Sequence, residues 1–220
     1  MNFFAHYCLQ NTGNAPYDFG LLVPDMLQLA RYPSALLHVR ERMRSESSDS
    51  RLYACMEGMC AHYAADAAFH RSTLFSEGLS RIKSCASDRG IRMSPLASHV
   101  LFELLLDHFL LTQHQADIDD MYAELSDVSV VTLADGICSV IGSPSGSLRS
   151  FFRRFMDRRY VRELADIVGV LDTIQRICAN FDAVPFTGNA EFIGAAYLCT
   201  GECLRGIPDE LSRAGFGRSV

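Results

Sequence analysis

The sequence lacks several features that would assign it to a specialised class of protein. Basic residues are not in excess, because Lys+Arg 20 against Asp+Glu 26 gives a formal net charge of -6. A general nucleic-acid binder needs surplus positive charge to displace counterions from phosphates, so that class is not expected. The N-terminus also lacks the basic region and following apolar run that are typical of a signal peptide.

No apolar stretch is long enough to span a bilayer. The longest, residues 100–111, is interrupted by Glu103, Asp107 and His108 and falls short of the roughly 20 residues that a membrane helix needs. The eight cysteines include no pair with the two-residue gap of a zinc knuckle or thioredoxin-like motif. We therefore expect a soluble cytoplasmic protein with reduced thiols and no membrane partner.

Helical periodicity dominates the 220 residues, and β-type alternation is nearly absent. Helices are expected over Ser50–His70, Leu74–Cys85, Leu96–Gln115, Ile118–Leu125, Val131–Ile141, Leu148–Arg159, Tyr160–Asn180 and Ala190–Leu204. Asp49 or Ser50 and Ser94 are good N-terminal caps for the two longest. The sequence predicts an all-α, single-domain helical bundle over residues 1–220, with a metal-site half at 1–116 and a further helical half at 117–220.

The histidines all fall within the first 114 residues, and two helices combine them with acids. Residues four apart advance by only about 40° around a helix, so His62, Asp66 and His70 share one face. On the next long helix, a second stripe joins four residues: His99, Glu103, Asp107 and His114.

Glu103 and Asp107 are surrounded by Leu, Phe and Val, so their helix should be largely buried. Buried carboxylates are costly unless a cation or hydrogen bonds compensate them. No Arg or Lys lies between Met93 and Tyr122, so the cation must come from another segment or be a metal. Imidazoles and carboxylates on facing helices can build a divalent metal site. The ordinary alternative is a solvated face with local hydrogen bonds.

Four motifs occur in a suggestive order. The chain opens with Met-Asn-Phe-Phe-Ala-His6, and Gly20-x-Leu-x-x-Asp25 follows. Two helical motifs come next, Gly58-x3-His62-x3-Asp66 and Glu103-x3-Asp107-His108-Phe109-Leu110. Together they resemble the acyl carrier protein phosphodiesterases, a divergent branch of the HD-type metal-dependent phosphohydrolases. A weaker likeness continues through Tyr160–Ile177.

The resemblance implies an HD-like helical domain that holds a divalent metal, with Mn²⁺ as the expected ion. The implied reaction is hydrolysis of the phosphodiester that joins 4′-phosphopantetheine to a serine of acyl carrier protein. The implied metal ligands are Asp25, His62, Asp66 and Asp107. His6 would be a further ligand or a general acid, and His108 would be catalytic or a ligand.

The chain also departs from the family. His70 stands where the family usually has an acid, and His114 stands where it usually has an aromatic residue, often Trp; this chain has no Trp. Glu103 would orient a metal ligand or be one itself. His70 and His114 would either enlarge the site or pack, whereas His99 and His38 have no counterpart in the family and are expected to be structural.

A basic run lies in the second half, with Arg149, Arg153, Arg154, Arg158, Arg159 and Arg162. Phe151, Phe152 and Phe155 are interleaved with it, so the helix is amphipathic and its charges should be exposed. Acyl carrier proteins are acidic, and Arg153, Arg154, Arg158 and Arg159 are the expected docking residues. The run could also be an ordinary solvated face, or bind a nucleic acid or a lipid phosphate.

Three functions remain open at this point. The first is the phosphodiesterase acting on holo acyl carrier protein. The second is an HD-like phosphohydrolase acting on a small phosphoester or nucleotide, which the departures at His70 and His114 keep open. The third is a non-catalytic helical protein that binds an acidic partner through its arginines.

Overall fold

The computed structural model describes residues 1–32, 38–41, 49–113, 117–181 and 184–216. These residues form helices, turns and loops, and no strand occurs among them. The predicted all-α class is therefore confirmed. All eight cysteines are free thiols.

The chain divides into two compact units that interleave along the sequence. The first unit comprises Met1–Ala5, Ala67–Gln115 and Val161–Val220, and the second comprises His6–Asp66 and Ala116–Tyr160. Each unit therefore takes segments from both sides of residue 116. Helices α1 (Phe3–Gln10) and α5 (Ser50–Arg71) contribute to both.

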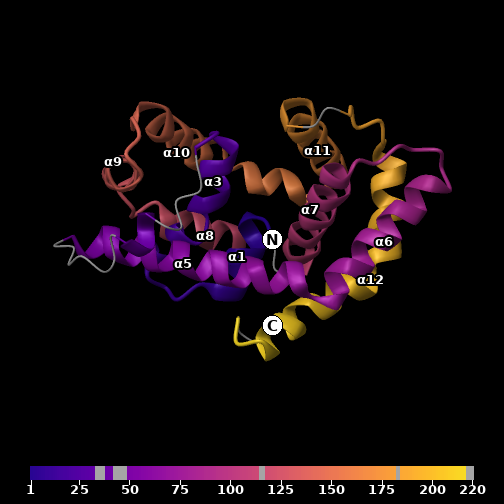
Figure 1. Ribbon diagram of the computed structural model, residues 1–220, viewed down its shortest axis with the longest axis horizontal. Coiled ribbons are helices and arrows are strands. Elements are labelled where there is room, and N and C mark those ends of the chain that lie inside the picture. Colours follow the sequence, from indigo (N-terminus) through magenta and orange to yellow (C-terminus); the bar gives the residue numbers. More distant parts are fainter. Residues whose placement is uncertain (33–37, 42–48, 114–116, 182–183, 217–220) are drawn as a thin grey trace. The chain divides into compact units, whose positions relative to one another are not determined.

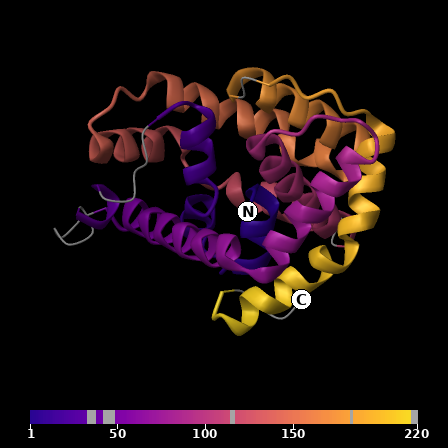
Figure 2. The ribbon, with the colours of Figure 1, turned by 45° about the vertical axis from the view of Figure 1, so that its right-hand side comes forward.

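The first unit is built on a helix pair far apart in sequence. Helices α6 and α12 run antiparallel and side by side (Figures 1 and 2). Arg81 of α6 forms an ion pair with Glu202 of α12 at 3.1 Å. Helix α7 packs against both and against α11. The helices of this unit are α6 (Thr73–Ser87), α7 (Pro95–Gln113), η1 (Tyr160–Ala165, a 3₁₀ turn), α11 (Ile167–Phe181) and α12 (Ala190–Arg213).

The second unit contains the first part of α5 together with several short helices. Helix α10 lies against α9 and α3, and α2 lies against α8 and α3. Phe19 and Phe152 meet edge to face in its core, with ring centroids 5.0 Å apart. Among its described residues, this unit includes α2 (Ala15–Gly20), α3 (Val23–Leu29), α8 (Asp117–Leu125), α9 (Val130–Ile141) and α10 (Gly146–Arg158).

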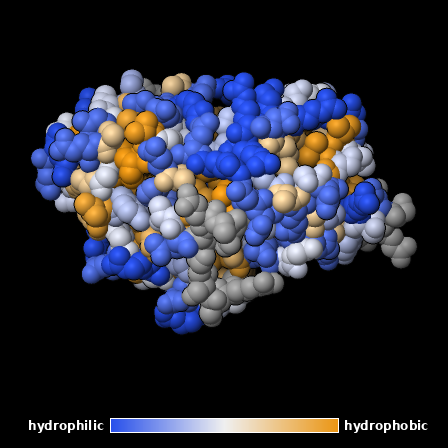
Figure 3. Space-filling view, turned by 180° about the vertical axis from the view of Figure 1, so that it is seen from behind, coloured by the Kyte–Doolittle hydropathy of each residue, from blue (hydrophilic) through white to orange (hydrophobic). Residues whose placement is uncertain are grey.

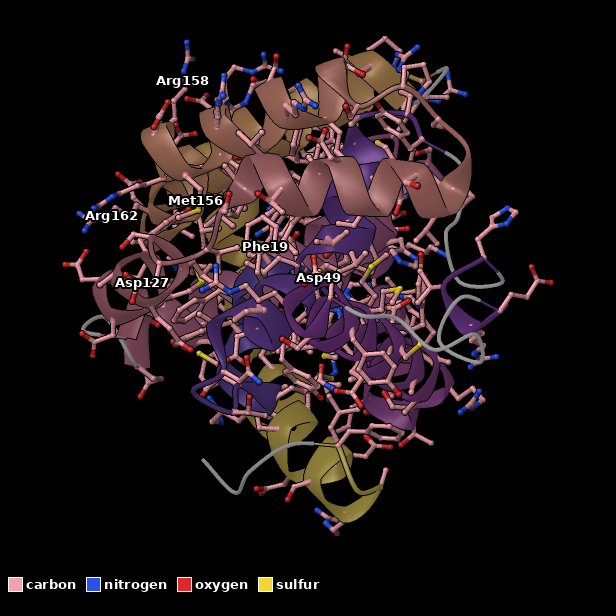
Figure 4. All side chains as sticks on the ribbon, turned by 90° about the vertical axis from the view of Figure 1, so that its left-hand side faces the viewer. Phe19, Asp49, Asp127, Met156, Arg158 and Arg162 are labelled. Atoms are coloured by element: carbon pink, nitrogen blue, oxygen red, sulfur yellow. The ribbon has the colours of Figure 1, made fainter. Side chains whose placement is uncertain are left out.

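Helix starts follow the predicted capping, and two predicted boundaries are wrong. Asp49 Oδ1 accepts hydrogen bonds from the first turn of α5 (Figure 4), and Ser94 Oγ accepts one from the first turn of α7. The helix expected over Tyr160–Asn180 is broken, because Asp166 Oδ1 accepts the Val168 N–H at 2.7 Å and a new helix begins there. Helix α12 continues beyond Leu204, because its next two turns also bury apolar residues.

Helix α7 is the one helix among the described residues long and apolar enough to cross a bilayer, yet 61% of its apolar window is buried inside the protein. This burial is typical of a core helix. Figure 3 shows hydrophobic residues on one face as separate patches among hydrophilic ones. Scattered patches of this kind are normal on a protein surface.

The backbones of α2 and α5 touch at two glycines. A Cβ on Gly58 would lie 2.0 Å from the Tyr17 carbonyl oxygen, and a Cβ on Gly20 would lie 2.1 Å from that of Cys55. No side chain fits there, so the two helices approach more closely than any other residue pair would allow. One turn beyond Gly58 on α5 comes His62.

We predict that Gly58→Ala destabilises the protein by about 1–3 kcal/mol or more, because the new methyl group would force the backbones apart. Gly194→Ala is the matched control: it lies within α12, nothing would meet its Cβ within 4 Å, and it should stabilise by about 0.5–1 kcal/mol. Urea unfolding of both variants measures the difference. Equal effects would show that the α2–α5 contact is not under steric constraint.

Candidate metal centre

His62 is fixed by the chain segment that joins α2 to α3. Its ring is buried, and Nδ1 lies 2.7 Å from the Leu21 carbonyl oxygen. A carbonyl oxygen only accepts, so Nδ1 carries the proton and donates. The other nitrogen, Nε2, lies 3.6 Å from Oδ1 of Asp25, in the first turn of α3. Metal-binding histidines are commonly oriented in this way, with the far nitrogen donating to a carbonyl.

His6 is held in the same manner by a side chain of its own helix. Nδ1 lies 3.0 Å from Gln10 Oε1, while the Gln10 Nε2 donates to the Ala61 carbonyl at 3.3 Å. This second bond fixes the amide so that its oxygen faces His6, and Nδ1 must donate. Nε2 of His6 is buried and has no hydrogen-bond partner among the described residues.

Burial keeps His6 neutral. The ring is completely buried and stacks on the His62 ring, with centroids 3.8 Å apart and planes at 23°. Burial, followed by the proximity of His62, lowers the pKa of His6 well below its ordinary value, and Asp66 only partly opposes this. A neutral ring with its proton on Nδ1 presents a lone pair on Nε2.

His6, Asp25 and His62 bring their ligand atoms within 4.8 Å of one another. A buried lone pair without a partner, a second imidazole and a carboxylate suit a divalent metal of the Mn²⁺ or Zn²⁺ type. Asp66, one turn after His62 on α5, lines a pocket of about 230 Å³ together with Asp25 and His62. We call His6, Asp25, His62 and Asp66 the α3–α5 site; all four lie in the second unit.

No protein-family model, curated protein or solved structure matches this chain. The assignment of function therefore depends on the residues themselves.

Asp107 has another partner that the sequence did not suggest. It is buried in the first unit, and its two oxygens accept the backbone N–H groups of Ala5 at 2.8 Å and Phe4 at 3.2 Å. Burial raises the pKa of Asp107 to about 7, although both N–H groups oppose the rise. Asp107 thus caps the N-terminus of α1. Its predicted coordination of the metal stays a prediction.

Glu103 and His70 also lie in the first unit, and there they meet His99. Glu103 Oε1 lies 3.0 Å from His99 Nε2, 3.2 Å from His70 Nε2 and 3.1 Å from the Met1 ammonium. His99 was expected to be only structural, and the structure brings it into this polar group. The sequence already indicated this neighbourhood, because His99 and Glu103 are four residues apart and share one face of the predicted helix.

His108 is buried, donates from Nδ1 to the Leu164 carbonyl at 2.7 Å and packs edge-on against Tyr197. These contacts anchor η1 and α12 to α7, and its predicted catalytic role stays a prediction. His114 lies outside the described residues. Gln10 was missed because no helix was expected over Phe3–Gln10; in that helix, residues four apart lie on one face.

The arginine run follows the predicted amphipathic pattern. Phe152 and Phe155 are buried, whereas Arg153, Arg154 and Arg158 are exposed. Figure 4 shows Arg158 extending outward from α10. Arg159 is less available, because it forms an ion pair with Asp119 and lies over the Tyr122 ring. Arg149 is similarly paired with Asp135.

We predict that Gln10→Met weakens Mn²⁺ binding about 10–100-fold, the usual effect of removing a residue that orients a ligand. The His6 ring would lose the bond that fixes its tautomer. Isothermal titration calorimetry measures the affinity, and Gln113→Met, the same change at an exposed position on α7, should leave it unchanged. Unaltered binding in Gln10→Met would mean that His6 is not a ligand.

Proposed function

We propose that the chain is a metal-dependent phosphodiesterase that releases 4′-phosphopantetheine from holo acyl carrier protein, with an HD-like metal centre at the α3–α5 site. One observation carries the proposal: the buried Nε2 of His6, without a partner among the described residues, beside His62 and Asp25. An unsatisfied buried nitrogen is costly in a folded protein unless it serves a ligand.

In this proposal His6, His62 and Asp25 hold the metal, and Asp66 completes or orients its shell from the pocket wall. When bound, a divalent ion lowers the pKa of a water molecule and offsets charge on the phosphoryl oxygens. His6 is assigned as a ligand rather than the general acid, because its Nδ1 proton is directed at Gln10 and its Nε2 presents a lone pair.

The pocket favours a substrate that is presented by a carrier. Its volume of about 230 Å³ is below the roughly 300–1,000 Å³ typical of sites that enclose a whole small molecule. A phosphodiester on the surface of a protein needs to insert only its reacting group. This size supports the carrier protein over a nucleotide substrate.

The exposed arginines of α10 suit an acidic carrier. Arg153, Arg154 and Arg158 place three positive charges on one helix of a chain with a net charge of -6. Local charge of this kind steers an oppositely charged partner and fixes its orientation. A cytoplasmic location belongs to the same proposal, since eight free thiols suit a reducing compartment.

We predict that Asp66→Asn and His62→Gln each lower the release of 4′-phosphopantetheine from holo acyl carrier protein at least about 100-fold. Mass spectrometry of the carrier after incubation with Mn²⁺ measures release. His38→Gln, at an exposed position, is the control. Hydrolysis of small phosphoesters or nucleotides but not of the carrier would favour the small-molecule phosphohydrolase. A wild-type protein that binds no Mn²⁺ would favour the non-catalytic protein that binds an acidic partner.

We also predict that reversing charge at Arg153 and Arg158 lowers kcat/KM for the carrier at low salt and leaves Mn²⁺ affinity unchanged. Exposed charges act over about 8–10 Å at physiological ionic strength, so added salt should depress the wild type more than the variant. The double variant Arg51→Glu/Arg92→Glu, with the same net change, is the control. If kcat/KM for the carrier has the same salt dependence in the wild type and in the Arg153/Arg158 variant, these arginines are only a solvent-exposed helix face and do not dock the carrier.

A further inference from the structure

A second group of potential metal ligands lies in the first unit, on two helices. His70 is in the last turn of α5, and His99 and Glu103 are one turn apart on α7. Their ligand atoms also lie within 4.8 Å of one another. We call these three residues the α5–α7 cluster.

The two imidazoles of this cluster compete for one oxygen. His70 Nε2 and His99 Nε2 lie 3.2 Å and 3.0 Å from Glu103 Oε1, and only 3.1 Å from each other. If both nitrogens donate to the carboxylate, two N–H groups meet at hydrogen-bond distance without an acceptor between them. If one nitrogen accepts from the other, it gives up its bond to Glu103. Protons alone therefore cannot satisfy all three contacts.

A metal ion satisfies them together. Each nitrogen then supplies a lone pair to the metal, and the carboxylate supplies an oxygen. Ligand atoms on a tetrahedral ion with bonds of 2.0–2.1 Å are separated by roughly 3.3 Å. The observed separations of 3.0–3.2 Å are close to that value, so the side chains need to move little.

The surroundings hold the ligands in place and keep the site accessible. The Phe75 ring packs against both imidazoles, with centroids 5.0 Å from His70 and 5.2 Å from His99. Glu103 is the most enclosed of the three side chains, with 17% exposed against 31% for His70 and 37% for His99. The partial exposure of both imidazoles would let water reach an ion bound there.

We propose that His70, His99 and Glu103 form a second metal site, for Zn²⁺ or a similar divalent transition ion, which ties the last turn of α5 to α7. Two imidazoles and one carboxylate are a ligand set that zinc commonly takes, with a fourth position open. The site is independent of the proposed phosphodiesterase function. The Met1 ammonium, also bonded to Glu103, would share this carboxylate with the ion or leave it.

The test is the amount of Zn²⁺ retained after equilibrium dialysis and gel filtration. We expect two equivalents in the wild type, one in His99→Gln, one in His62→Gln and none in the double variant. His38→Gln should retain two. Zn²⁺ should also raise the Tm of His62→Gln but have no such effect on the double variant. Because the eight cysteines could bind zinc, Co²⁺ replaces it in a parallel experiment, where a thiolate-to-cobalt absorption band would reveal cysteine ligands.

The outcomes separate the two sites. If only the α3–α5 site fails, the wild type retains one equivalent, which His99→Gln loses and His62→Gln keeps. His70→Gln is the second variant and should match His99→Gln, with circular dichroism verifying that each is folded. Equal Zn²⁺ retention by wild type, His99→Gln and His70→Gln would overturn the proposal, as would a thiolate band that accounts for the bound metal.

Discussion

The apolar helix α7 carries two carboxylates, Glu103 and Asp107, whose charges other groups in the first unit must compensate. Burying an ionised acid costs several kcal/mol unless nearby groups compensate it. Glu103 is compensated by the Met1 ammonium and two histidines, and Asp107 is compensated in part by the first amides of α1. Both solutions recruit the first five residues of the chain. Burial alone would raise the pKa of Glu103, but these partners hold it well below its usual value.

The same anchoring bears on His6. The amides that Asp107 binds belong to Phe4 and Ala5, directly before His6 in the same helix. A helix held at its first turn has little freedom to rotate, and the Gln10 contact fixes the ring one turn later. Asp107 therefore holds the first turn of α1 within the first unit, and Gln10 holds the His6 ring within the second.

The sequence was sufficient for the helical class and the exposed arginines, because both follow from periodicity alone. It also grouped His62 with Asp66 correctly, since residues four apart on a helix share a face. It could not predict the hydrogen bond from His62 to the Leu21 carbonyl. Nor could it predict the contact between α2 and α5 at Gly20 and Gly58, because both depend on how separate helices meet. His99 illustrates the limit: its face was evident from spacing, but its partner His70 lies on another helix. The broken helix at Asp166 depends on one side chain competing for a backbone N–H.

The two histidine clusters use similar donors in different surroundings, and this difference separates their chemistry. In the α3–α5 site both rings are buried, and each Nδ1 is fixed by an acceptor, so the facing nitrogens are preset before any ion arrives. Ligands held in place before an ion binds would suit the catalytic role proposed for this site. In the α5–α7 cluster the rings are about one-third exposed and meet around a shared oxygen, so protons and metal compete for the same nitrogens. An ion bound at this proposed site would exchange more readily than one in the buried site, which would suit a stabilising link between two helices.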